Sequence, residues 1–199
     1  MKVNLKVRRF NPEVDGGKTW WQSYSVEMPA YATVLDTLIE VRESTDGTLA
    51  LRCSCRSAVC GSCAMRINGQ ARLACKAKVA ALSPREGQEI VVEPGGNLPV
   101  IKDLGVDMKP FWDKVRAVQP WLQPPAGPPP EREYVASNEA MLELAGVMNC
   151  IMCGACVMDC TVLEVDQRFL GPAALAKALR FVHDPRDAAT RERLRELSK

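Results

Sequence analysis

The residues of this sequence best suited to chemistry are its nine cysteines, which stand beside a single histidine, His183. Five of them lie between Cys53 and Cys75, and the other four lie between Cys150 and Cys160. Cysteines in a chain without a secretion signal bind metal or do redox chemistry more often than they form structural disulfides. The sequence therefore predicts two separate metal or redox sites.

The first group follows the pattern C-x4-C-x2-C at Cys55, Cys60 and Cys63, and Cys75 follows after eleven intervening residues. Plant-type ferredoxins use this spacing to hold a 2Fe-2S cluster. Small residues between the cysteines would let backbone amides approach the sulfur atoms. A structural zinc ion is the alternative, but zinc sites usually combine two C-x2-C pairs and this group contains one. We expect these four cysteines to bind a 2Fe-2S cluster, and Cys53 to be a small buried hydrophobic residue rather than an accessory ligand.

The second group, Cys150, Cys153, Cys156 and Cys160, follows the pattern C-x2-C-x2-C-x3-C. Bacterial ferredoxins use this run for 4Fe-4S clusters: three cysteines bind one cluster, and the fourth binds another cluster whose own run supplies the missing ligands. No such second run occurs in this sequence. All four cysteines could bind one 4Fe-4S cluster, another chain could supply ligands, or the sequence could end before the natural C terminus. The helical character of the last residues, RERLRELSK, favours the third alternative.

The elements that must position the first group can be predicted from the apolar pattern. Residues 2–10 alternate apolar and charged side chains, which predicts a strand, and a second strand over 20–28 can pair with it across a polar turn. Thr33 can cap a helix over residues 34–44, whose apolar side chains fall on one face. Further short strands are expected at residues 64–67, 72–74 and 89–93. Residues 1–108 are therefore predicted to form a small sheet packed on a helix.

The second half of the chain is predicted to be helical. Six of the fourteen prolines fall between Pro120 and Pro130, where neither a helix nor a central strand can continue. Ser137 can cap a helix that runs to Asn149, and residues 171–199 are rich in Ala, Leu, Arg and Glu at helical spacing. The predicted fold class is α+β, with a sheet domain over residues 1–108, a proline-rich connector over 109–136 and a helical domain over 137–199.

Composition and charge exclude several classes of function. The chain has 199 residues, 47% of them hydrophobic and 25% charged, which is typical of a globular protein. Its net charge of +2 gives no case for nucleic acid as a partner. No apolar run approaches the ~18 residues that span a bilayer, and the first residues lack the apolar centre of a signal peptide, so we expect no transmembrane segment. No phosphate loop, nucleophile elbow or HExxH motif occurs, so no catalytic residue for substrate turnover is expected on this chain.

Several segments of the chain together resemble one protein family. They read SCRSAVCGSCAMRINGQARLAC over residues 54–75, NLPVIKDLGVDM over 97–108, CIMCGACVMDC over 150–160 and FLGPAALAKALRFVHDPRD over 169–187. In this order they are similar to the iron–sulfur subunit of succinate dehydrogenase and fumarate reductase. The resemblance implies an N-terminal β-grasp domain of the 2Fe-2S ferredoxin type and a C-terminal all-α ferredoxin-like domain.

The resemblance also implies a place in the respiratory chain and the tricarboxylic acid cycle. A flavoprotein partner would oxidise succinate at its FAD, and electrons would pass through a 2Fe-2S, a 4Fe-4S and a 3Fe-4S cluster to quinone near membrane-anchor subunits. The chain would be a peripheral subunit on the cytoplasmic face of the inner membrane. By position, the implied ligands are Cys55, Cys60, Cys63 and Cys75 for the 2Fe-2S cluster, Cys150, Cys153 and Cys156 for the 4Fe-4S cluster, and Cys160 for the 3Fe-4S cluster.

Two departures from the family leave alternatives open. The later cysteine run that supplies the family's remaining ligands is missing, so the 4Fe-4S and 3Fe-4S ligand sets are incomplete in this sequence. Cys160 is followed by TVLEV, at residues 161–165, where many members carry a proline and the tryptophans of the quinone pocket. One alternative is therefore a fumarate reductase subunit that runs the reverse reaction with a quinol or other donor. Another is a stand-alone two-cluster ferredoxin, although a pI of about 8.1 argues against the acidic surface that such a carrier needs for docking.

Overall fold

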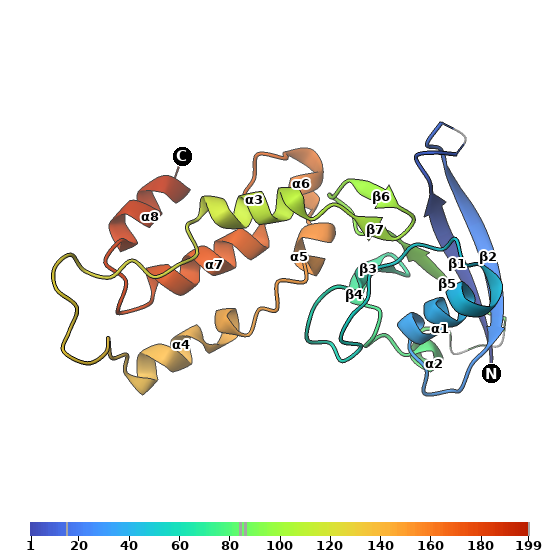
Figure 1. Ribbon diagram of the computed structural model, residues 1–199, viewed down its shortest axis with the longest axis horizontal. Helices are drawn as coiled ribbons and strands as arrows, with labels where there is room; N and C mark the ends of the chain where they lie inside the picture. Colours follow the sequence, from blue (N-terminus) through green and yellow to red (C-terminus); the bar gives the residue numbers. More distant parts are fainter. Residues whose placement is uncertain (15, 84, 86, 199) are drawn as a thin grey trace. The chain divides into compact units, whose positions relative to one another are not determined.

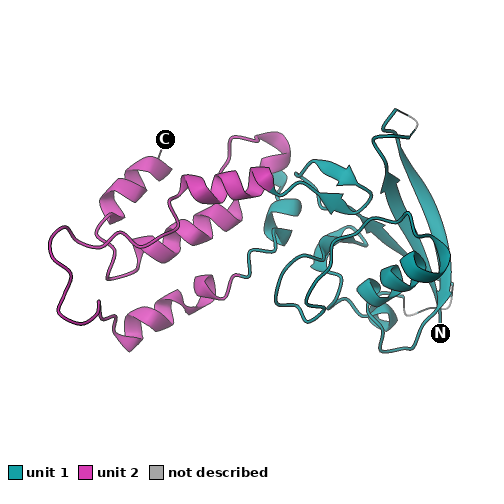
Figure 2. Ribbon diagram, in the orientation of Figure 1, with its two compact units in different colours: residues 1–108, 151–161 teal, residues 109–150, 162–199 magenta. Residues whose placement is uncertain are grey.

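The chain separates into two compact units (Figure 2). The computed structural model describes residues 1–14, 16–83, 85 and 87–198. Unit 1 contains residues 1–108 and 151–161, and unit 2 contains residues 109–150 and 162–199. The sequence analysis assigned residues 151–161 to the helical domain, whereas in the structure their contacts with two strands of unit 1 group them with the sheet.

Unit 1 is built on a five-stranded mixed sheet in the order β2-β1-β5-β3-β4 (Figure 1). The strands are β1 (Lys2–Phe10), β2 (Thr19–Glu27), β3 (Ala64–Ile67), β4 (Gln70–Leu73) and β5 (Glu89–Glu93). β1 pairs antiparallel with β2 and parallel with β5, which confirms the predicted N-terminal hairpin. Alternate residues of β1, namely Val3, Leu5 and Val7, are fully buried, as the alternating sequence pattern predicts.

A capped helix packs on the sheet of unit 1. α1 (Val34–Glu40) begins after Thr33, whose hydroxyl accepts a hydrogen bond from the amide of Asp36 at 3.2 Å. The carboxylate of Asp36 in turn accepts a bond from the amide of Thr33 at 2.9 Å, which completes a capping box. The chain continues as a π-helical turn, η1 (Val41–Thr45), so the helix predicted over 34–44 is present but changes its hydrogen-bond pattern in the second half. The buried face of α1 belongs to the hydrophobic cluster of the sheet.

The hairpin of β3 and β4 turns at Asn68 and Gly69, whose φ angles are +50° and +76°. A two-residue hairpin turn of this kind requires positive φ at both central residues, and Asn and Gly tolerate it best. Pairing resumes at once, with Ile67 opposite Gln70. The strand predicted at residues 72–74 begins two residues earlier because the turn is so short.

Unit 1 also contains elements that the sequence analysis did not predict. They are the short helices α2 (Val79–Leu82) and α5 (Ala155–Met158), and the two-stranded sheet of β6 (Val100–Lys102) and β7 (Gly105–Val106). Each is at most four residues long, which is too short for a recognisable apolar period. α5 contacts β3 and β4 and so joins the second cysteine group to the sheet.

A buried ion pair anchors the segment that leads into the first cysteine group. Arg9 of β1 is 2% exposed and Asp103, in the turn between β6 and β7, is fully buried, with 2.9 Å between Nε and Oδ1. Arg9 also lies 2.7 Å from Asp46, and Asp103 accepts a bond from the amide of Ala50. Burial lowers the pKa of Arg9, but the hydrogen bonds to Asp103 and Asp46 outweigh it and hold that pKa above its usual value. The guanidinium therefore stays charged and ties β1 to residues 46–50.

The elements that the structure describes in unit 2 are helices (Figure 1). They are α3 (Lys109–Ala117), α4 (Asn138–Met148), α6 (Thr161–Val165), α7 (Pro172–Val182) and α8 (Thr190–Leu197). α7 contacts α3, α4 and α8. Ser137 caps α4 as predicted, because its hydroxyl accepts a bond from the amide of Ala140 at 3.3 Å. The predicted connector, 109–136, begins with α3, whose Phe111 and Val115 are four residues apart and are both buried.

Candidate iron–sulfur sites

The first cysteine group lies in unit 1, on an irregular loop that runs into β3 and on the residue pair that follows β4. Ala64 pairs with Leu73 in this hairpin, and the amide of Ala74 donates to the carbonyl of Cys63 at 3.1 Å. The hairpin therefore brings Cys75 back beside Cys63, although eleven residues separate them in the sequence.

Backbone amides of the loop point at two of the cysteine sulfur atoms. Cys55 Sγ accepts hydrogen bonds of 3.3–3.4 Å from three amides, those of Ser57, Val59 and Cys60. Cys75 Sγ accepts a bond of 3.3 Å from the amide of Ala58. Hydrogen bonds of this kind stabilise a thiolate and tune a metal bound to it. Together with the hairpin, they place the four predicted ligands on one loop and at the end of β4, although among the described residues no three His, Cys, Asp or Glu side chains stand together as a metal site.

The loop reaches this geometry through residues in the left-handed backbone conformation. Arg56 and Ala58 both have φ of +56°. For residues other than glycine this conformation is unfavourable by about 1–3 kcal/mol, and such strain clusters at functional sites. The two turns direct the amides of Ser57 and Val59 towards sulfur, so the strain is coupled to the arrangement of the site.

Two thiols of the loop differ in their environment. Cys60 is exposed, and hydrogen bonds with Ser62 and with Cys55 lower the pKa of its thiol to about 6. Cys63 is 3% exposed, and burial raises the pKa of its thiol to about 11. Only the thiolate binds a metal. At pH 7 Cys60 is therefore largely ionised, whereas Cys63 would have to release its proton in order to bind a metal.

Cys53 resembles the predicted ligand Cys75 in its burial. Its side chain is partly buried and packs against the hydrophobic cluster of the sheet. The neighbouring Arg52 donates to the carbonyl of Val106 at 3.2 Å, which fixes the chain just before the loop. The interpretation of Cys53 as a small hydrophobic residue stays a prediction.

The second cysteine group is divided between the two units. Cys153, Cys156 and Cys160 belong to unit 1, and Cys150 belongs to unit 2. Within unit 1 the chain turns at Met152 and Gly154, which have φ of +57° and +79°, and then forms α5. The structure therefore brings three of the four predicted ligands of this group to the sheet domain.

Asp159 attaches the second group to the sheet. Its Oδ2 accepts a hydrogen bond from the amide of Ala71 on β4 at 2.5 Å. Its Oδ1 lies 3.1 Å from Nε of Arg66 on β3. Asp159 is the only acidic residue within the CIMCGACVMDC segment, a signal that the sequence analysis missed.

Asn97 makes a second attachment. Its side-chain amide donates to the carbonyls of Val157 and Cys160 at 2.8 and 2.9 Å. The carbonyl of Val157 also accepts a bond from the amide of Cys160 at 3.1 Å, so Asn97 adds a further donor at the end of this helix. Asn97 itself has φ of +60°, a conformation that asparagine adopts more readily than most residues. No local sequence pattern indicates this role, because sixty residues separate Asn97 from Val157.

The two cysteine groups also meet through their backbones. A Cβ atom placed on Gly61, between Cys60 and Cys63, would lie 2.7 Å from Cα and 2.8 Å from Cβ of Cys153. Real Cβ atoms do not come so close to their neighbours, so only glycine fits at this point. The first ligand loop therefore lies directly against a predicted ligand of the second site.

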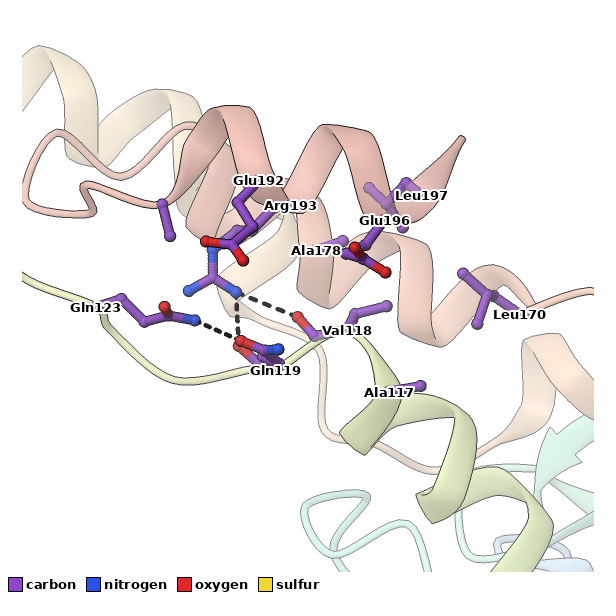
Figure 3. Close-up of a pocket in the computed structure, with 11 residues that line it drawn as sticks. Ala117, Val118, Gln119, Gln123, Leu170, Ala178, Glu192, Arg193, Glu196 and Leu197 are labelled. Carbon is purple, nitrogen blue, oxygen red and sulfur yellow. Dashed lines mark hydrogen bonds between the residues drawn. The ribbon is translucent and has the colours of Figure 1, made fainter. Parts of the chain in front are cut away.

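Unit 2 contains a cavity of about 230 Å³ beside α3, α7 and α8 (Figure 3). Its lining includes the apolar side chains of Val118, Leu170 and Leu197, and none of the predicted site residues. Arg193 of α8 turns its guanidinium towards backbone carbonyls at the edge of the cavity and pairs with Asp187 at 2.8 Å. The guanidinium of Arg193 is thus used in packing, and no predicted cysteine ligand lines the cavity.

Comparison with known proteins identifies the class of this chain. Residues 4–113 match the family of 2Fe-2S iron–sulfur cluster binding domains. The fumarate reductase iron–sulfur subunit of Mycobacterium tuberculosis is 37% identical over 196 residues, which are 96% of this chain and 76% of that protein. The mitochondrial succinate dehydrogenase (ubiquinone) iron–sulfur subunit 3 of Arabidopsis thaliana is 33% identical over 200 residues, which are 100% of this chain and 64% of that protein. The Mycobacterium smegmatis Sdh1 complex in the apo form contains a chain that matches with a TM-score of 0.84 and 27% identity, covering 98% of this chain and 80% of that one.

The fold and the first site thus define an iron–sulfur protein with a 2Fe-2S ferredoxin-type domain. The chain belongs to the family of iron–sulfur subunits of succinate dehydrogenases and fumarate reductases. This confirms the resemblance found in the sequence and the predicted class, an electron-transfer subunit of an oxidoreductase. The chain spans 76% and 64% of the lengths of the two relatives described above.

Proposed function

We propose that this chain is the electron-relay subunit of a succinate:quinone oxidoreductase, which passes electrons from the FAD of a flavoprotein partner towards quinone. The observation that carries the proposal is the first cysteine loop, in which four amides donate to the sulfur atoms of Cys55 and Cys75. Membership of the family supports the same role. The chemistry at succinate would belong to the partner, and this chain would carry no catalytic residue.

The proposed ligands of a 2Fe-2S cluster are Cys55, Cys60, Cys63 and Cys75. The residues fit this group, because all four donors are sulfur atoms, one thiol ionises below pH 7 and backbone amides face the sulfur. When bound, such a cluster accepts and releases single electrons. The amides would stabilise negative charge on the ligands, which makes reduction easier.

For the second group the proposed assignment is Cys150, Cys153 and Cys156 to a 4Fe-4S cluster and Cys160 to a 3Fe-4S cluster, in an all-α ferredoxin-like domain. The spacing of this run supports the assignment, since ferredoxins use it to share ligands between two clusters. The remaining ligands would come from a further cysteine run, in the same protein or in another chain.

The proposed partners are a flavoprotein that carries FAD and one or more membrane-anchor subunits. In the part of the chain that the structure describes, no helix has the length and apolarity to cross a membrane. By the family resemblance, we propose that this chain is a peripheral subunit on the cytoplasmic face of the inner membrane and that the anchor subunits provide the membrane contact.

Fumarate reduction, in which electrons run towards the flavin from a quinol or another donor, is a second candidate function. Two observations favour it. The relative from Mycobacterium tuberculosis is a fumarate reductase subunit. No aromatic residue follows Cys160 in the segment Thr161–Val165, where Val162 and Val165 are exposed. Rates of succinate oxidation and fumarate reduction by the isolated complex, compared with the same donor and acceptor pair, decide between the two directions.

The ligand assignment is tested by comparing two cysteine variants of the complex. Cys60→Ala should remove the 2Fe-2S signal in electron paramagnetic resonance and slow succinate-driven reduction of an acceptor, while FAD stays bound in the partner. Cys53→Ala is the matched control and should leave both unchanged. Turnover that is equal in the two variants contradicts the relay role.

Iron and acid-labile sulfide in the native complex give the number of clusters. Roughly nine irons per chain correspond to the proposed three clusters, and roughly six to one 2Fe-2S and one 4Fe-4S cluster. Zinc without sulfide would contradict the iron–sulfur assignment altogether.

A further inference from the structure

The docking of residues 151–161 on the sheet has features that the geometry of α5 alone does not explain. β4 is an edge strand of the sheet, and edge-strand amides lack a partner strand on one side. Asp159 supplies an acceptor to one of them, the amide of Ala71, at 2.5 Å. A carboxylate at the C-terminal end of a helix is electrostatically unfavourable, and Asp159 is the residue that ends α5. Its contacts with the sheet, including the one with Arg66, account for an acidic residue at this position.

The segment before β6 also lies close to the turn at the end of α5. A Cβ on Gly96 would lie 2.5 Å from the carbonyl oxygen of Met158, so a side chain at residue 96 would push the turn away. The next residue, Asn97, donates to two carbonyls of the turn, those of Val157 and Cys160. Attraction from Asn97 and the absence of a side chain on Gly96 thus act together to keep the turn close.

These attachments bring the two cysteine groups into backbone contact. Gly61 belongs to the first ligand loop and Cys153 belongs to the second group, and the space between them is too small for a single Cβ atom. At this point Gly61 and Cys153 are in direct contact. The separation of the sites is therefore sensitive to any movement of residues 151–161 away from the sheet.

We propose that Asp159, Asn97 and Gly96 are positioning residues that set the separation between the first cysteine loop and the part of the second group that lies in unit 1, where Gly61 and Cys153 are in contact. The inference rests on the proposed function and adds the residues that control its rate. With the proposed clusters bound, one electron would leave the first site, which would be oxidised, and enter the second, which would be reduced, and no bond would be made or broken. Electron transfer slows steeply as the separation grows, so residues that bind no metal control the step by holding the two loops together.

The test compares Asp159→Ala with Asp166→Ala in the assembled complex. Asp166 is a matched control, because its carboxylate is also paired with an arginine, Arg168, and it belongs to unit 2. In Asp159→Ala, we expect hydrogen exchange of the Ala71 amide to be about tenfold faster, since it loses a charged acceptor. The magnetic interaction between the reduced first and second clusters should weaken, while iron content and the midpoint potential of the first cluster stay unchanged. The control should alter none of these.

Two further variants make the result specific. Asp159→Asn keeps an acceptor for Ala71 and should restore most of the exchange protection. Asn97→Gly keeps the left-handed backbone, removes the two donated hydrogen bonds and lies outside both cysteine groups. It should also weaken the magnetic interaction, whereas Asn68→Gly, at another left-handed asparagine, should not. If Asp159→Ala loses a cluster, the magnetic interaction in Asn97→Gly decides whether the positioning role holds.

The outcomes distinguish failure of the positioning role from failure of the proposed function. Faster exchange of Ala71 with an unchanged magnetic interaction would overturn the positioning role while leaving the proposed function intact. Absence of iron–sulfur clusters from the unaltered complex would overturn the proposed function itself. Weakened interaction in both Asp159→Ala and Asn97→Gly, with the controls unchanged, supports the inference.

Discussion

The two cysteine groups of this chain are held in place by different means. The first lies on one loop and one hairpin, and local amides donate to the sulfur atoms of Cys55 and Cys75. The second is divided between the units, and its part in unit 1 is attached to the sheet by single side chains such as Asp159 and Asn97. The first site is thus defined by local sequence, whereas the second depends on contacts between residues far apart in the chain.

The spacing of a set of ligands can therefore be encoded in one segment of the chain, and the contacts that place them can be encoded in others. The strained turns at Arg56 and Ala58 build the first site where the cysteines themselves are. For the second site the spacing is in the cysteine run, but the contacts that place it are in β3, β4 and the segment before β6. Changes in these distant segments should therefore affect the second site more than the first.

The largest expected effects come from removing one ligand of each group. Cys75→Ala should abolish the 2Fe-2S signal and leave the 4Fe-4S signal, because the second group keeps all its cysteines. Cys153→Ala should do the reverse and leave the first signal in place. Electron paramagnetic resonance of the reduced complex at two temperatures measures both. Loss of both signals in Cys75→Ala would show that the second site depends on the first for its assembly.

A smaller effect is expected from the buried arginines, one in each unit. Arg9→Ala leaves the buried carboxylate of Asp103 without the cation that pairs with it and should lower the free energy of unfolding by about 3–5 kcal/mol. Arg193→Ala, which leaves the buried Asp187 unpaired, should have a similar effect on stability.

Their consequences for the first site should differ. Arg9 fixes residues 46–50, just before the first loop, so only its substitution should broaden the 2Fe-2S signal. Chemical denaturation gives the stability and the spectrum gives the site. An equal spectral change in both variants would mean that the first loop responds to global stability and not to its own anchor.

The contact between the two groups can be isolated with a pair of glycines. Gly61 and Gly69 have almost the same φ, +74° and +76°, so alanine is strained by a similar amount, about 1 kcal/mol, at either position. Only at Gly61 would the new Cβ meet another part of the chain, the backbone of Cys153. Gly61→Ala should therefore cost about 1–3 kcal/mol more than Gly69→Ala in thermal unfolding. Equal costs would mean that residues 151–161 move away from the sheet without loss of stability.

The smallest effect concerns pH. Hydrogen bonds from Thr48 hold the pKa of Asp46 below its usual value, helped by Tyr24 and Arg9 and opposed by burial. Because the folded pKa lies below the unfolded one, Asp46 stabilises the fold above about pH 4, and this contribution is lost as the pH falls through the folded value. Asp46→Asn should lower stability by about 1 kcal/mol at pH 7.

Urea unfolding at pH 7 and at pH 3 measures this effect. The difference between Asp46→Asn and the unaltered chain should be smaller at pH 3, because the unaltered chain has then lost part of its advantage. A difference that is equal at the two pH values would exclude Asp46 as a source of acid sensitivity.

Much of unit 1 could be predicted from the sequence, for physical reasons that are local. The alternation in residues 2–10 determines β1, and the side chains of Thr33 and Asp36 determine where α1 begins. The cysteine spacing predicted the first ligand group, and its assignment to a cluster stays a prediction. Short-range patterns of this kind are complete within a few residues, so a single sequence displays them.

The attachments of the second group could not be predicted in the same way. The bond from Asn97 to Val157 joins residues sixty positions apart, and neither residue belongs to a periodic pattern. The close approach of Gly96 to Met158 is likewise visible only once the chain is folded. α3 was not predicted although Phe111 and Val115 stand at helical spacing, because its nine residues contain Pro110 and lie next to the proline-rich segment.

The β3–β4 hairpin limits how the length of this chain can vary. Ala64 must stay opposite Leu73 for Ala74 to bond to Cys63 and for Cys75 to reach the loop. One residue inserted within either strand would shift the register and turn each following side chain to the opposite face. Insertions at the turn, by contrast, leave the pairing of the strand ends unchanged. Natural length variation between Cys63 and Cys75 should therefore be confined to the turn.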